Sequence, residues 1–190
     1  TAGALRYAFR DADGWHIQIV DNNPGDTGFY TSIALDQNDL AHITYYDAFS
    51  GLLRYSYFDG VDWQIQAIDK TGIYSSLVLD SSDTPHVSYH DMGTGVLKYA
   101  YLDAAGWITE TLDSNSDATS FTAIAMDDAG YPHIGYFDEI SGTLKYIFQD
   151  TNGWNLQDLG DGLNAGYYLA LEISPDGLPW ISYYDETNGD

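Results

Sequence analysis

Short runs of apolar and aromatic residues, separated by turns rich in Asp and Gly, recur along the whole chain. β-Branched and aromatic residues dominate these runs, as they do in pleated strands. Windows long enough for a helix lack an apolar pattern at i, i+3 and i+4 that is free of Gly, Asp or Pro. The hydrophobic pattern therefore predicts an all-β protein.

A repeat of about 47 residues organises these runs. Trp15, Trp63, Trp107 and Trp154 follow one another after 48, 44 and 47 residues, and a Gly stands twelve residues before each of them. Repeats of this length are typical of propellers and solenoids. We expect a single domain over residues 1–190, with repeats at 3–50, 51–94, 95–141 and 142–188.

Each repeat is predicted to hold four short strands. In the first complete set they cover residues 32–36, 42–47, 52–58 and 63–68. Many of these strands carry apolar residues on both faces, so each sheet must be covered on both sides. Four-stranded antiparallel units of this size, stacked around an axis, are the blades of a β-propeller.

The order of strands within the repeats suggests how the propeller closes. The sequence begins with the third and fourth strands of a unit and ends with the first and second strands of another. Joined together, these halves would complete a blade, in the "velcro" closure that removes exposed sheet edges. One chain could close as a four-bladed monomer, or two chains could exchange half-blades in an eight-bladed ring. Bulky Tyr residues could fill the wedge between widely splayed blades, which favours the monomer.

The spacing of the repeats also indicates a candidate site. All length variation falls between each Trp and the next first strand, at 17, 13, 16 and 16 residues. Variable loops on a fixed scaffold are where binding sites usually lie. Strand direction places these loops on the same face as the turn between the second and third strands. The candidate ligand site there consists of Tyr30, Tyr74, Phe121 and Tyr168 with Asp47, Asp91, Asp138 and Asp185.

These residue types also have a structural explanation. Asp at the entry of a hairpin commonly accepts hydrogen bonds from turn amides, and a cation lies across the strand pair from each Asp region. The aromatic residues could pack in the core as readily as they stack on a ligand. The cations concerned are Arg6, Arg54, Lys98 and Lys145.

No metal or other cofactor is expected. His42, His86 and His133 recur at one strand position, but Trp180 replaces them in the fourth repeat, which favours packing over metal binding. Calcium is the one ion left open, because Asp11 begins a loop with hard oxygen ligands. The further acids of an EF-hand do not follow it.

Charge and composition narrow the range of partners. The chain has 29 acidic against 6 basic residues and a net charge of -23, which disfavours nucleic acid and anionic membrane surfaces. Its 44% hydrophobic and 15% aromatic content argues for a packed fold despite that charge. Asp-rich turns account for the acids, although a saline or calcium-rich habitat would also suit them. No apolar run approaches transmembrane length, and no Cys is present.

The sequence offers little for catalysis. Hydrolysis needs a general acid and base with separated pKa values, or an activated nucleophile. Phosphate loops, nucleophile elbows and metalloprotease helices are absent from the sequence. None of the four glutamates belongs to a cluster of catalytic residue types that sets one repeat apart from the others. We therefore expect no catalytic residue and no enzyme. The four glutamates are Glu110, Glu139, Glu172 and Glu186.

The repeat unit LDSSDTPHVSYHDMGTGVLKYAYLDAAGW resembles those of secreted bacterial β-propellers. It is more loosely similar to the Asp-box (BNR) repeats of sialidases and to propeller-lectin repeats. The segment from Ser174 to Trp180 comes closest to an Asp-box but is one residue short. Sialidases use three arginines with a Tyr and a Glu. Here Arg6 and Arg54 occupy equivalent repeat positions and only Arg10 remains, so sialidase activity is not expected.

Together these observations predict a non-enzymatic extracellular or cell-surface module that binds a glycan or a protein. A structural repeat segment of a larger surface protein is the alternative, and a glycosidase or lyase ranks last. The expected assembly is a monomer, or a homodimer formed by exchange of half-blades.

Overall fold

A computed structural model describes residues 3–23, 25–114, 121–160 and 165–185, which form sixteen strands and no helix. The structure thus has no helix that could cross a membrane in these residues. The strands divide into two pairs and three sheets of four. The outer pairs are β1 (Leu5–Asp11) with β2 (Gly14–Asp21), and β15 (Ala165–Ile173) with β16 (Pro179–Asp185).

Three complete four-stranded sheets lie between these pairs, and we call them the first, second and third blades. The first blade contains β3 (Thr27–Leu35), β4 (Ala41–Asp47), β5 (Leu52–Phe58) and β6 (Trp63–Lys70). The second contains β7 (Gly72–Leu79), β8 (Pro85–Asp91), β9 (Val96–Asp103) and β10 (Gly106–Asp113). The third contains β11 (Thr122–Met126), β12 (Pro132–Asp138), β13 (Thr143–Asp150) and β14 (Gly153–Asp158).

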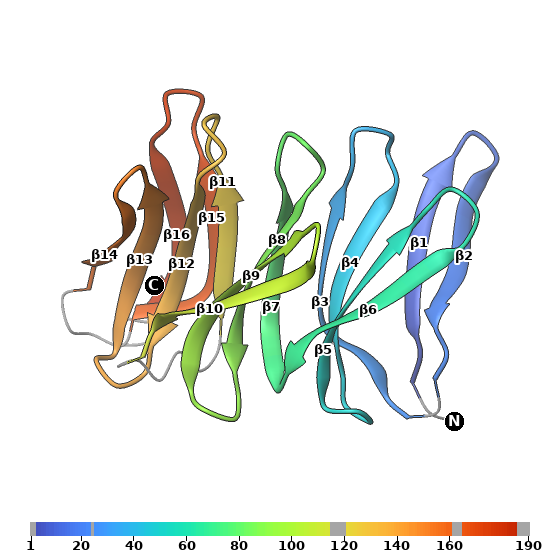
Figure 1. Ribbon diagram of the computed structural model, residues 1–190, viewed down its shortest axis with the longest axis horizontal. Coiled ribbons are helices and arrows are strands. Elements are labelled where there is room, and N and C mark those ends of the chain that lie inside the picture. Colours follow the sequence, from blue (N-terminus) through green and yellow to red (C-terminus); the bar gives the residue numbers. More distant parts are fainter. Residues whose placement is uncertain (1–2, 24, 115–120, 161–164, 186–190) are drawn as a thin grey trace.

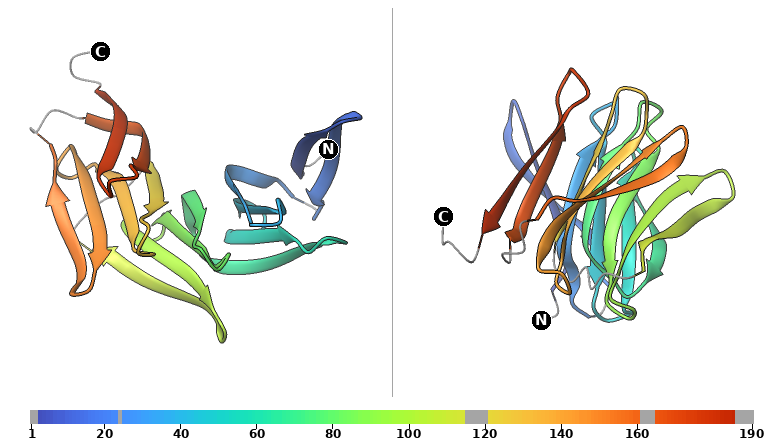
Figure 2. Two further views of the ribbon diagram at one scale, coloured as in Figure 1. Left: turned by 90° about the horizontal axis from the view of Figure 1, so that it is seen from above. Right: turned by 90° about the vertical axis from the view of Figure 1, so that its left-hand side faces the viewer.

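Strands in each sheet are antiparallel and paired in sequence order, as predicted for a blade. Successive sheets stand side by side along an arc (Figure 1). Their first strands, β3, β7, β11 and β15, contact one another along its concave side (Figure 2). The all-β architecture of four-stranded antiparallel sheets is therefore confirmed.

The predicted joining of half-blades is not formed within this chain. The β1–β2 pair and the β15–β16 pair remain separate two-stranded sheets. They stand at opposite ends of the open arc (Figure 2). The number of blades and the closure of the ring stay predictions.

Turns between the strands are built by Asp side chains. Oδ1 of Asp36 accepts hydrogen bonds from the amides of Asn38 and Leu40, both at 2.8 Å. Asp59 does the same for the amides of Val61 and Asp62 at 2.9 and 2.8 Å. Because Asp satisfies turn amides in this way, part of the acidic excess is structural.

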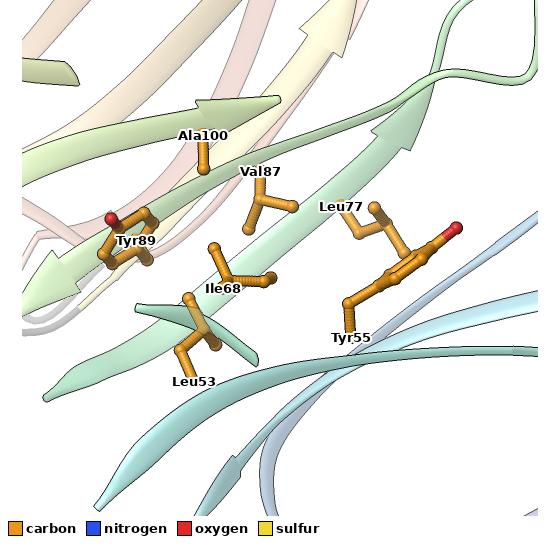
Figure 3. Close-up of a cluster of buried hydrophobic side chains, with 7 residues drawn as sticks. All are labelled: Leu53, Tyr55, Ile68, Leu77, Val87, Tyr89 and Ala100. Carbon is orange, nitrogen blue, oxygen red and sulfur yellow. The ribbon is translucent and has the colours of Figure 1, made fainter. Parts of the chain in front are cut away.

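The hydrophobic core is divided into layers that lie between successive sheets. In the layer between the first and second blades, Leu53 and Tyr55 pack against Leu77, Val87 and Tyr89 (Figure 3). Equivalent layers cover the other faces of both blades. Each sheet is therefore apolar on both faces because a neighbour covers each face, as the sequence pattern predicted.

A buried tyrosine on the second strand ties each complete blade to the sheet before it. The hydroxyl of Tyr89 donates to Oδ2 of Asp69, at the end of β6, over 2.7 Å. Tyr45 and Tyr136 donate likewise, at 2.6 Å, and all three tyrosines have no exposed surface. The acceptors of these two bonds are Asp21 and Asp113.

We expect Tyr89→Phe to lower the free energy of unfolding by about 1–3 kcal/mol, because it removes a donor from a partly buried carboxylate. Tyr101→Phe is the matched control: this ring lies on the next strand, and its hydroxyl has no hydrogen bond in the described residues. That change should stay within about 0.5 kcal/mol. Urea denaturation measures both, and equal effects would show that the hydroxyl bond adds nothing.

Candidate functional site

Three of the four first strands carry a bulge at the predicted aromatic position, whereas Phe121 directly precedes β11, which pairs without a register shift. In β3, Tyr30 and Thr31 together lie opposite Tyr45, because Phe29 pairs with Tyr46 and Ser32 with Thr44. The register shifts in the same way in β7 and in β15. Such a bulge redirects a side chain out of the sheet.

The bulge holds a bulky residue in a backbone region that usually takes glycine. The φ angles of Tyr30, Tyr74 and Tyr168 are 53°, 51° and 52°. A left-handed conformation of this kind costs about 1–3 kcal/mol per residue and clusters at functional sites. The strained conformation recurs at three of the four equivalent aromatic positions, so the fold supports it in three sheets.

The three bulge tyrosines and Phe121 form a continuous row of four aromatic rings, which we call the aromatic row. Ring centroids are 4.3 Å apart from Tyr30 to Tyr74, 5.3 Å from Tyr74 to Phe121 and 4.5 Å from Phe121 to Tyr168. The four aromatic residues of the predicted site are thus brought together, although they are far apart in sequence.

Hydroxyl groups of the next blade hold the row in place. The hydroxyl of Ser75 donates to the carbonyl oxygen of Tyr30 at 3.4 Å. Thr122 repeats this contact with the carbonyl of Tyr74 at 3.1 Å. Since Tyr30 and Tyr74 are each bound by the following blade, this part of the row is assembled only when the blades stack.

The row forms one wall of an open groove. Tyr30, Tyr74 and Phe121 line it together with the hydroxyl-bearing residues beside them. Tyr168 is 72% exposed and Tyr30 43% exposed, so ring surface is accessible to a ligand. Burial and the hydrogen bond with Tyr30 raise the pKa of Tyr74, and the nearby charge of Glu139 adds to this.

Glu139 is a site residue that sequence reasoning missed. It follows Asp138 in the turn between β12 and β13, and it is exposed. The equivalent positions in the first two blades are Ala48 and Met92, so this carboxylate near the row is not shared by every repeat. The presence of a carboxylate at this position in the third blade, and its absence from the first two, was the sequence signal that could have identified Glu139.

Three of the four predicted aspartates are buried in the structure. Asp47, Asp91 and Asp138 are 1%, 5% and 1% exposed. Oδ2 of Asp47 accepts from Arg54 Nε at 2.8 Å, and Oδ1 accepts from the amides of Phe49 and Ser50. The oxygens of Asp47 are therefore committed to the hairpin, and ligand binding by these aspartates stays a prediction.

The other two buried aspartates are bound in a similar way. Lys98 Nζ lies 2.9 Å from Asp91 and 2.8 Å from Asp69 of the blade before. Lys145 lies 2.5 Å from Asp138 in the third blade. The fourth candidate, Asp185, lies half-buried at the end of β16.

The bridging aspartates at the ends of β2, β6 and β10 were also missed. A regular signal was present, since each falls six residues after the repeated Trp. The spacing that defines the repeat therefore includes these positions, but only the folded chain shows that they bind the next blade. They are Asp21, Asp69 and Asp113.

The recurring histidines lie in the sheets and not at the aromatic row. Nδ1 of His86 is hydrogen-bonded to the Tyr99 hydroxyl, and its ring stacks on Tyr101. On the other side, Nε2 lies 3.5 Å from Asp80. No group of three or more potential metal ligands occurs among the residues that the structure describes.

No known family model matches this chain, and no curated protein matches it either. Solved structures do show a similar fold. A fucose lectin from Kordia zhangzhouensis is 20% identical over 67% of this chain and 96% of its own, with a TM-score of 0.49.

Two further similar structures align over nearly the whole chain. The NanB sialidase of Streptococcus pneumoniae is 14% identical over 92% of this chain, with a TM-score of 0.59. An exo-β-1,3-galactanase of Phanerochaete chrysosporium is 12% identical over 97%, with a TM-score of 0.55. This chain spans only 31% and 47% of those two proteins. At these identities the likeness concerns the fold alone, and it is that of a β-propeller-like repeat protein.

We expect acid to destabilise the protein in two steps. Burial lowers the pKa of His42 and His86 below the usual 6.5, although the nearby aspartates oppose this. The unfolded chain then binds protons more readily, so stability falls as the pH drops below about 6.5. Exposed carboxylates stay ionised down to about pH 5. Repulsion among them therefore does not weaken in this pH range, and it does not offset the loss of stability that the histidines cause.

The second step comes from the buried aspartates. Burial alone would raise the pKa of Asp91 and Asp138, but bonds from Thr71, Ser141 and the lysines outweigh it and lower both pKa values. Their contribution is present above the ordinary value of 3.8 and is lost as the pH falls through the lowered pKa. Urea unfolding between pH 7.5 and 2.5 measures both steps, and a constant midpoint throughout would contradict them.

Proposed function

We propose that the aromatic row binds a neutral glycan and that the protein binds it without hydrolysis. The observation that carries this proposal is the row formed by Tyr30, Tyr74, Phe121 and Tyr168 beside an open groove, with the three tyrosines on strained bulges. Such rings offer flat apolar faces with polar edges. A sugar ring, with apolar C–H faces and a rim of hydroxyls, complements that arrangement.

Backbone strain supports binding over simple packing. A core aromatic residue could be placed by an ordinary strand, yet these positions keep the left-handed conformation and leave Tyr168 largely exposed. Exposure of a large ring gains nothing from the hydrophobic effect. We infer that the bulge is kept because it presents the ring to a ligand.

Charge restricts the class of glycan. The net charge of -23 repels polyanions, and Glu139 places a carboxylate near the row. A carboxylate accepts hydrogen bonds from sugar hydroxyls but repels carboxylated or sulfated sugars. A neutral polysaccharide or oligosaccharide is therefore the expected ligand class.

The buried aspartates favour binding without turnover. Glycosidases generally place two carboxyl groups on either side of the scissile bond. Asp47, Asp91 and Asp138 cannot serve in such a pair, because cations and turn amides already hold them. The similar sialidase and galactanase act on glycans, which agrees with a glycan ligand for this fold without assigning their activity to this chain.

A glycan array that includes neutral, sialylated and sulfated glycans tests the proposal. We expect binding to neutral glycans, with the anionic ones at background at physiological salt. Incubation of the bound glycans should release no product. Binding only to anionic glycans, or release of product, would contradict the proposed function.

Tyr168→Ala should weaken glycan binding about tenfold or more, because stacking on a large ring is lost. Tyr168→Phe is the matched control and should keep binding within a few fold, since Phe121 already shows that a Phe fits the row. Isothermal titration with the best array ligand measures both. Equal loss in the two variants, with unchanged circular dichroism, would argue against stacking.

A further inference from the structure

The β1–β2 and β15–β16 pairs expose strand edges whose counterparts are buried in every complete blade. Second strands β8 and β12 are buried along their whole length, whereas β16, the second strand of its unit, is mostly exposed. Tyr183 is 49% exposed, while its counterparts Tyr45, Tyr89 and Tyr136 are fully buried. Trp180 is 68% exposed. An apolar edge of this kind indicates an interaction surface.

We propose that β16 pairs with β1 of a second copy of this chain, so that two copies exchange half-blades in a closed ring with two-fold symmetry. Each copy then supplies both halves of the contact, so the β16 and β1 edges of both copies are paired. This inference is independent of the proposed glycan site.

The register of the complete blades sets the two strands against each other. Each hairpin Asp pairs with the first residue of the third strand, as Asp47 does with Leu52 and Asp91 with Val96. The repeat makes Ala4 the counterpart of Leu52. Asp185 therefore faces Ala4 of the second copy, and both strands supply the donors and acceptors of a full ladder.

Charge is complementary across this contact. In each complete blade a cation on the third strand binds the hairpin Asp, at 2.8 Å for Arg54 and Asp47 and at 2.9 Å for Lys98 and Asp91. The corresponding cation on β1 is Arg6, which is exposed and has no ion pair in the described part of the chain. In the exchanged ring Arg6 reaches Asp185 of the other copy.

Trp15 supplies an independent observation, because it lacks the partners of its three counterparts and is 71% exposed. Trp107 packs edge-on against Tyr55 of the preceding blade at 5.2 Å, and its Nε1 donates to Gln66 at 3.0 Å. The other two tryptophans repeat both contacts. They involve Trp63 with Tyr7 and Gln18, and Trp154 with Tyr99 and Glu110.

The missing partners of Trp15 exist on the third blade. Tyr146 and Gln157 occupy the positions equivalent to Tyr55 and Gln66, and they line an open groove together with Ile181 and Tyr183. The groove therefore lies where the β1–β2 pair of a second copy would place Trp15. Docking of that β1–β2 pair would fill the groove with Trp15 and would add the third and fourth strands to the β15–β16 pair.

Pairing of β16 with β1 of a second copy requires less rearrangement of the blades than pairing of β16 with β1 of the same chain. Within one chain, the two edges stand at opposite ends of the arc (Figure 2). Three repeated Trp contacts, at 3.0, 3.0 and 3.1 Å, and three Tyr–Asp bonds fix the step from sheet to sheet. Bending the arc to close it would disturb these packed layers, which do not deform continuously.

Light scattering of the 190-residue chain across a dilution series is the first test. We expect twice the mass of one 21.0 kDa chain. Arg6→Asp and Asp185→Arg should each weaken the dimer roughly 100-fold or more, because both contacts then set like charges together. Arg10→Asp is the matched control. It makes the same change of charge on β1, but the equivalent position in the third strand of the first blade lies beyond the residues that pair with the second strand.

Mixing the two charge variants separates the outcomes. An equimolar mixture of Arg6→Asp with Asp185→Arg restores complementary charges in both contacts, so the doubled mass should return. A chain of single mass at all concentrations would overturn the proposal, as would a mass unaffected by either variant. Growth beyond two chains with concentration would show open addition of chains in place of a ring. Circular dichroism of each variant checks that the fold is kept.

Discussion

A sheet that is apolar on both faces is stable in water only when a neighbour covers each face, and this constraint organises the whole structure. The layers between blades contain the large buried side chains, such as Tyr55, Val87 and Tyr89. No blade has a core of its own, so stability depends on stacking, as in other repeat proteins. Apolar packing is not directional. The Tyr–Asp hydrogen bond between neighbouring sheets is directional, and it fixes how far one sheet is rotated relative to the next.

The candidate site follows from the same stacking. The bulge that turns Tyr74 outward lies opposite Tyr89, whose hydroxyl reaches back to the preceding blade. Thr122 of the following blade then binds the carbonyl of Tyr74. Strain in the left-handed residue is thus supported from both sides, and the ring faces the groove. Structure and site share the same contacts, which explains why both repeat with the same period.

Charge has a structural role that composition alone conceals. The chain is strongly acidic, yet its buried hairpin aspartates are matched by three recurring cations and by turn amides. Arg54, Lys98 and Lys145 each bind a hairpin aspartate. The same pattern leaves Arg6 and Asp185 on the two exposed edges, which is why the repeat itself defines the proposed contact between copies. Other acids, such as Asp36 and Asp59, accept hydrogen bonds from the amides of turns within the blades.

The sequence by itself determined the repeat, the strands of each blade and the aromatic members of the site, because strand periodicity and turn chemistry are local. It placed the first strand of the first blade at residues 32–36, whereas β3 begins at Thr27, since a bulge breaks the alternation on which the prediction depends. Only the tertiary structure decided that Asp47 is buried and that Tyr30 and Tyr74 touch. Both facts depend on which sheets pack against each other. An apolar pattern in the sequence shows that a face of a sheet must be covered, but it does not show which element covers that face.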